Sequence, residues 1–69
     1  MSREEQATRA VALVALELER GHAVTARQVS DRFGCHIRTA QRWLEMVDLY
    51  VMPLSREKYA RKAAIWRKA

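Results

Sequence analysis

The chain has 69 residues, which is enough for one small domain. Such a domain has a thin stability margin, and a deep substrate pocket would take up much of its core. Thirteen Lys and Arg against eight Asp and Glu give a net charge of +5, which favours a surface that binds polyanions over an active-site cavity.

The excess positive charge lies in the last quarter of the chain. Residues 1–52 are balanced, whereas residues 53–69 carry six Lys and Arg and only one Glu. We interpret this segment as a surface that binds nucleic acid through electrostatic attraction, and the alternative is a solvated basic surface. The residues of the segment expected to contact DNA are Arg56, Lys58, Arg61 and Lys62.

The sequence favours a cytoplasmic location for the protein. The lone Cys35 cannot form an internal disulfide, which fits a reducing compartment. The opening Met-Ser-Arg-Glu-Glu does not look like a signal peptide, and the longest apolar run, Ala10 to Leu16, is far shorter than the about 20 residues of a membrane span. We therefore expect a cytoplasmic protein with no membrane partner.

A first helix is predicted from about Arg3 to Arg20. Ser2 and Glu5 match a capping box at its start, and Gly21 supplies the left-handed residue that commonly ends a helix. Apolar residues recur at helical spacing along one face, namely Ala7, Val11, Val14 and Leu18. His22 and Ala23 then form a short connection.

Two further helices are predicted, from about Ala26 to Phe33 and from about Ile37 to Asp48. Thr25 and Gln28 make a capping box before the second helix, and Gly34 ends it. The third helix has an inward-facing stripe of Ala40, Leu44 and Val47.

The last twenty residues allow two structures, because Pro53 ends the helical pattern. One is a β-hairpin with a strand near Leu49–Leu54, a basic tip at Arg56–Lys62 and a return strand at Ala63–Lys68. The other is a basic helix, in which Tyr59, Ala63 and Trp66 would share a face. Local propensity favours the helix, and no glycine marks a hairpin tip.

The segment from Thr25 to Val47 combines a short capped helix, a glycine turn and a longer helix. Two helices joined this tightly must cross steeply, so their apolar faces meet and the first helix covers the back of the pair. The outer face of the third helix is then left protruding, and a helix fits the major groove of DNA. That face carries Arg38, Thr39, Gln41, Arg42 and Glu45. Arg and Gln are the side chains that can read guanine and adenine edges.

This segment resembles the helix-turn-helix of winged-helix regulators of the DeoR and biotin-repressor type, over about residues 8–48. The resemblance rests on the capping Thr25, the small Ser30, the turn Gly34 and the run His36-Ile37-Arg38-Thr39-Ala40-Gln41-Arg42. It implies a mainly α fold, a three-helix core with a C-terminal β-hairpin wing at about residues 50–68. It also makes the hairpin the preferred structure there. No effector domain follows, so no small-molecule effector is expected.

Three residues depart from the pattern of that family. His36 and Ile37 replace a usual Ser and Arg, and Trp43 replaces a residue that is normally polar and exposed. We expect Trp43 to pack against Trp66 or Tyr50.

The candidate contact residues have different expected roles. Arg38 and Arg42 are predicted base and phosphate contacts, with a solvated helix face paired to Glu45 as the alternative. Gln41 is a candidate base contact and Thr39 a candidate phosphate contact. Ile37 either meets a thymine methyl group or lies at the edge of the core. Arg27 of the second helix is a further candidate contact.

The predicted function is sequence-specific binding of double-stranded DNA by a small transcriptional regulator. One such module has a small footprint, so we expect a homodimer or tandem binding. Stand-alone domains this short resemble those of phages and mobile elements. One alternative is a protein-docking or inhibitor module that uses Trp43, Tyr50 and Trp66 as an exposed patch, and another is an RNA binder.

Neither an enzyme nor a cofactor is expected. The sequence offers no Ser/His/Asp or Cys/His arrangement, no glycine-rich phosphate loop and no paired inward carboxylates. Cys35, His36 and His22 lack the number and spacing of zinc ligands.

Overall fold

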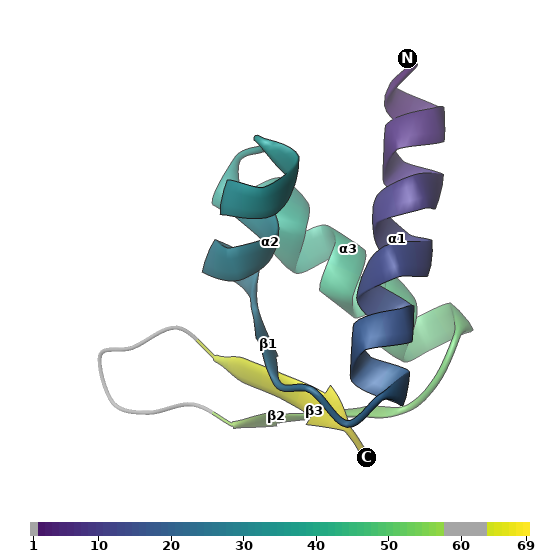
Figure 1. Cartoon of the computed structure of the whole chain (residues 1–69), viewed down its shortest axis with the longest axis vertical. Helices are drawn as coiled ribbons and strands as arrows, with labels where there is room; N and C mark the ends of the chain where they lie inside the picture. Colours follow the sequence, from purple (N-terminus) through teal and green to yellow (C-terminus); the bar gives the residue numbers. More distant parts are fainter. Residues whose placement is uncertain (1, 58–63) are drawn as a thin grey trace.

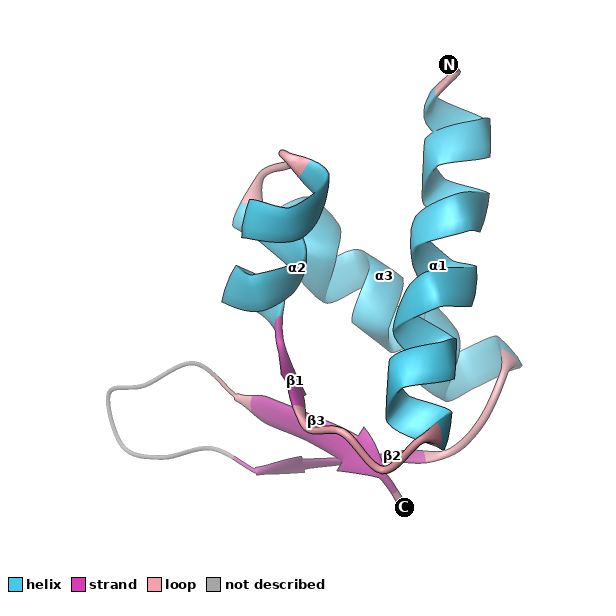
Figure 2. Ribbon diagram, in the orientation of Figure 1, coloured by secondary structure: helices cyan, strands magenta, loops and turns pink. Residues whose placement is uncertain are grey.

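The computed structural model describes residues 2–57 and 64–69, and consists of three helices and a three-stranded antiparallel sheet (Figures 1 and 2). In these views α3 passes behind α1 and α2, and the sheet lies at one end of the helices. The predicted mainly α fold, with a three-helix core and a C-terminal hairpin, is confirmed. The elements in chain order are α1 (Arg3–Glu19), β1 (Val24–Thr25), α2 (Ala26–Phe33), α3 (Ile37–Tyr50), β2 (Leu54–Glu57) and β3 (Ile65–Lys68).

Helix α1 begins and ends at the predicted signals. The Ser2 hydroxyl accepts a hydrogen bond from the Glu5 backbone N–H at 3.1 Å, which satisfies one of the free donors of the first turn. The helix ends at Glu19, one residue before the predicted end, with Gly21 at φ 87°. The backbone N–H groups of Gly21 and His22 bond to the carbonyls of Leu18 and Glu17, which closes the helix as a Schellman motif.

A short strand, β1, precedes α2 where only a connection was predicted. Val24 and Thr25 pair with Trp66 and Ile65 of β3. Two residues carry no periodicity of their own, so their strand conformation comes from a partner far along the chain. Thr25 also forms the predicted capping box of α2, since its hydroxyl accepts from the Gln28 N–H and the Gln28 side chain accepts from the Thr25 N–H.

The turn between α2 and α3 depends on a glycine and a histidine. Gly34 ends α2 in the left-handed region at φ 63°. The Ser30 hydroxyl donates to the Cys35 carbonyl and so ties the turn back to α2. His36 caps α3, because its Nδ1 accepts from the Arg38 N–H at 3.1 Å, and it thus replaces the Ser that is usual in the resembling family.

We expect the Gly34→Ala variant to lose about 1–2 kcal/mol of unfolding free energy, because an L-residue in the left-handed conformation brings its Cβ close to the backbone. A Cβ at this position meets nothing within 4 Å, so the loss comes from the backbone alone. Urea denaturation measures it, and Gly34→Asn should lose less, since Asn tolerates this conformation better. Equal stability of wild type and both variants would show that the turn does not need a positive φ.

The C-terminal segment is a hairpin, and its first strand lies further along than predicted. Helix α3 continues to Tyr50, and β2 begins only at Leu54, so the predicted strand Leu49–Leu54 is wrong. The physical reason is that no helix breaker occurs before Pro53, and that the Asp48 carboxylate accepts from the Leu54 N–H at 2.8 Å across the bend. Arg56, predicted at the tip, lies within β2 and faces Trp66 of β3.

Burial of Trp66 explains why the hairpin forms although local propensity favours a helix. The side chain is only 5% exposed and belongs to the core, while Leu54 is half-buried against that core. Removing an aromatic surface of this size from water outweighs small differences in helix propensity.

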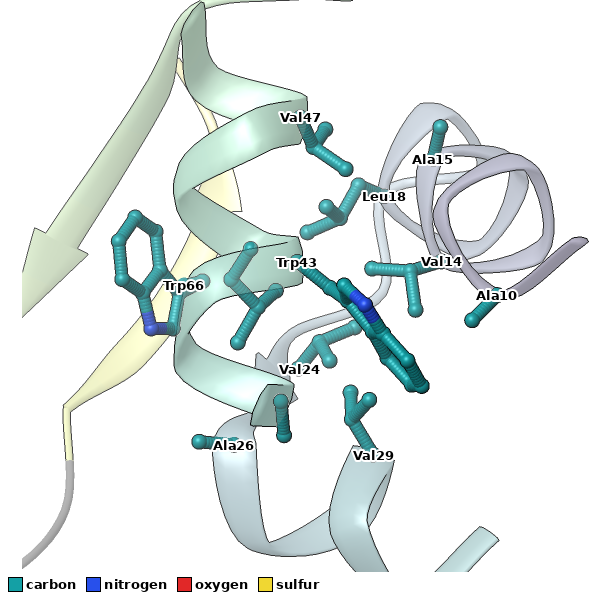
Figure 3. Close-up of a cluster of buried hydrophobic side chains, with 12 residues drawn as sticks. Ala10, Val14, Ala15, Leu18, Val24, Ala26, Val29, Trp43, Val47 and Trp66 are labelled. Atoms are coloured by element: carbon teal, nitrogen blue, oxygen red, sulfur yellow. The ribbon is translucent and has the colours of Figure 1, made fainter. Parts of the chain in front are cut away.

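The core lies between the three helices and the sheet, and Trp43 is at its centre (Figure 3). Trp43 is 5% exposed and meets Phe33 edge-on, with ring centres 5.8 Å apart. Trp66 lies on the other side of α3 and Tyr50 is exposed, so the predicted packing of Trp43 against either of them is wrong. The physical reason is a tertiary contact, because Trp43 projects toward α1 and α2 and meets Phe33 of α2 there.

Candidate nucleic-acid interface

The outer face of α3 presents the predicted reading residues together. Arg38, Gln41 and Arg42 are all exposed, and their spacing of three and four residues places them on one side of the helix. The opposite side is anchored by Ala40, Leu44 and Val47, each completely buried. Rotation of the helix is therefore fixed, and so is the direction in which the polar side chains project.

The charge of this face changes along α3. Its first half carries Arg38 and Arg42 without an acid, whereas Glu45 and Asp48 occupy the second half. The Asp48 carboxylate already holds the Leu54 N–H. The first half of α3 is therefore the part that suits an anionic partner.

The other candidates in the helices lie at different depths. Ile37 is half-buried and packs against the core, which fits its expected place at the core edge. Thr39 is also half-buried, on the flank of α3. Arg27 is exposed in the first turn of α2, on a different element from the outer face of α3.

The hairpin adds a positioned arginine. Arg56 and Trp66 are directly opposite each other in the β2–β3 ladder, and the Arg56 guanidinium lies 5.4 Å from the Trp66 ring centre. That distance is typical of a cation–π contact, which holds the arginine against the buried Trp66 ring. Arg67 is exposed on β3, and Lys68 pairs with Glu19 at 3.0 Å. The predicted contacts Lys58, Arg61 and Lys62 lie outside the described residues.

The aromatic patch considered as a docking surface does not form. Trp43 and Trp66 are each 5% exposed, so only Tyr50 of the three is available to a partner. The apolar surface lies elsewhere, at the end of α3, where Leu49 and Tyr50 are 72% and 80% exposed and Val51 follows. Of these residues the sequence indicated only Tyr50, because the predicted helix ended at Asp48.

Among the described residues, Glu17 and Cys35 have shifted pKa values, and neither belongs to the outer face of α3. A hydrogen bond from His22, at 2.6 Å, lowers the pKa of Glu17, and the charges of Arg20 and Arg32 act in the same direction. Burial raises the pKa of the Cys35 thiol, so that it stays protonated and weakly nucleophilic at neutral pH. Among residues 2–57 and 64–69, no three His, Cys, Asp or Glu side chains are grouped as metal ligands would be.

Sequence reasoning missed one basic residue beside α3. Arg3 lines a groove of about 540 Å³ between the start of α1 and α3, together with Thr39 and Arg42. A signal was present, because Arg3 precedes Ala7 by one turn and so begins the inward stripe of α1.

The described part of the chain thus presents three basic features. They are the outward face of α3, the groove between α1 and α3 that Arg3 and Arg42 line, and the hairpin with Arg56 against Trp66. No described helix is long and apolar enough to cross a membrane. Comparisons with protein-family models, with curated proteins and with solved structures gave no match. What this surface can do follows from its chemistry, which is that of guanidinium and amide donors.

Proposed function

We propose that this protein binds double-stranded DNA sequence-specifically, as a small transcriptional regulator, with the outer face of α3 in the major groove. The observation that carries the proposal is the exposure of Arg38, Gln41 and Arg42 on a helix whose opposite face is completely buried. Arg can donate two hydrogen bonds to guanine, whereas the Gln amide donates one hydrogen bond to adenine and accepts one from it. A helix with a fixed rotation presents these side chains without a cost for ordering the backbone, so that only the side chains themselves are ordered on binding.

The hairpin supports the proposal as a backbone contact. Arg56 and Arg67 are exposed on β2 and β3, and the sequence between the strands adds Lys58, Arg61 and Lys62. Several cations this close together in the sequence suit contact with the phosphates that border the major groove of DNA. The order α1-β1-α2-α3-β2-β3 also supports the resemblance to winged-helix regulators, in which the hairpin is the wing.

Fluorescence anisotropy tests the proposal, with the DNA that flanks the gene and a shuffled duplex of equal composition, each at low and physiological salt. Tighter binding to the native duplex that persists at physiological salt is expected, because base contacts depend less on salt than phosphate contacts do. Equal binding to both duplexes that physiological salt abolishes would leave only a nonspecific basic surface. Tighter binding to an RNA duplex would favour the RNA-binding alternative.

A further inference from the structure

We propose that the groove between α1 and α3 binds a phosphate of the DNA backbone, so that Arg3 is a contact residue. The inference rests on the proposed function and extends it to a third element. Figure 3 shows α3 between α1 on one side and β3 with Trp66 on the other. The groove and the hairpin therefore flank the outer face of α3 on opposite sides.

The groove has the chemistry of an anion site. Arg3 comes from the first turn of α1, and Arg42 from α3, so two separate elements each contribute an arginine to the lining of one space of about 540 Å³. Thr39, whose hydroxyl is a neutral donor, also lines it. No Asp or Glu lines the groove. Two guanidinium groups and a hydroxyl match the several acceptor oxygens of a phosphate.

Neither arginine is neutralised within the described structure. The acids of α1 that form ion pairs, Glu17 with His22 and Glu19 with Lys68, lie at the other end of that helix from Arg3. The lining of the groove also includes the apolar residues Ala7, Trp43 and Met46. A cleft of one charge sign over a low-dielectric wall concentrates its field, so an anion there is attracted more strongly than on an open surface.

The position of Arg42 favours the DNA backbone over a free anion. Arg42 belongs both to the groove and to the outer face of α3, one turn from Arg38. A ligand in this protein groove is therefore adjacent to a ligand on the outer face of α3. In duplex DNA the phosphates border the major groove, in which the base edges are exposed. A contact of this kind fixes the register of α3 without reading sequence.

The test compares Arg3→Ala with Arg9→Ala in the anisotropy assay with both duplexes. The two arginines lie on the same helix and both are exposed, but Arg9 does not line the groove, so the control removes the same charge elsewhere. Loss of one phosphate contact reduces the slope of log K against log salt by about 0.9, which is about fivefold in affinity at 0.15 M salt. We expect this loss for Arg3→Ala on both duplexes equally, and a much smaller one for Arg9→Ala.

The outcomes separate this inference from the proposed function. If wild type binds the native duplex specifically and both variants lose the same small amount, the groove is not a phosphate site although the function stands. If wild type binds no duplex, the proposed function fails and the inference fails with it. If the two duplexes bind equally and Arg3→Ala still loses about fivefold, the phosphate site stands without specificity. A titration with inorganic phosphate completes the test, because phosphate binding that needs Arg3, with DNA affinity unchanged in Arg3→Ala, would assign the groove to a free anion.

Discussion

Replacing Trp43 with alanine is expected to lower the unfolding free energy by about 3–5 kcal/mol. The side chain is 5% exposed, meets the Phe33 ring edge-on, and projects from α3 toward Val14 and Val29 (Figure 3). Its loss removes both the aromatic contact and the apolar surface that joins α3 to the other two helices. Since domains are stable by only about 5–15 kcal/mol, a large fraction of the variant should be unfolded at moderate urea. Circular dichroism during urea denaturation measures the change.

Tyr50→Ala is the matched control for that experiment. Tyr50 lies on the same helix, is also aromatic and is 80% exposed, so its removal should change the unfolding free energy by no more than about 0.5 kcal/mol. Equally small losses in the two variants would contradict the burial of Trp43. Equally large losses would instead mean that Tyr50 is covered in solution.

The double variant Arg38→Ala with Gln41→Ala is expected to abolish most of the discrimination between native and shuffled DNA. Each bidentate contact to a base contributes about 1–3 kcal/mol of discrimination, so the two together correspond to at least about thirtyfold. The fold should be unaffected, because both side chains are exposed and point away from the core. Anisotropy with the two duplexes, at one salt concentration, measures the ratio of affinities.

Arg32→Ala serves as the control here, since Arg32 is exposed on α2 and does not belong to α3. Its affinity ratio should equal that of wild type. A double variant that keeps the wild-type ratio would show that α3 does not read the sequence. If the affinity for both duplexes fell by one common factor, Arg38 and Gln41 would instead contact the DNA backbone.

Local signals were sufficient to predict the helices. Thr25 with Gln28 forms a capping box that needs only residues three apart, and Gly34 has the left-handed conformation that its position between two helices requires. The buried Ala40, Leu44 and Val47 also fixed which side of α3 faces outward. The exposure of Arg38 and Arg42 followed from that register alone.

Features that depend on distant partners could not be predicted in this way. The strand β1 exists because Val24 and Thr25 pair with β3, and the place of Trp43 depends on Phe33 of a neighbouring helix. The groove of Arg3 is formed by two helices that only the tertiary fold brings together. The exact start of β2 depends on the Asp48 side chain, whose partner lies across a bend.

The position of β3 has a consequence for how the protein folds. In the sheet order β1-β3-β2, the strand that comes last in sequence is the central one, and β1 and β2 each pair only with it. Every ladder of the sheet is therefore lost at once if β3 detaches. The Val24–Trp66 pairing closes a long stretch of chain, whose loop-closure entropy must be overcome before any contact compensates for it. We therefore expect the helices to associate first and the sheet to close in a single late step.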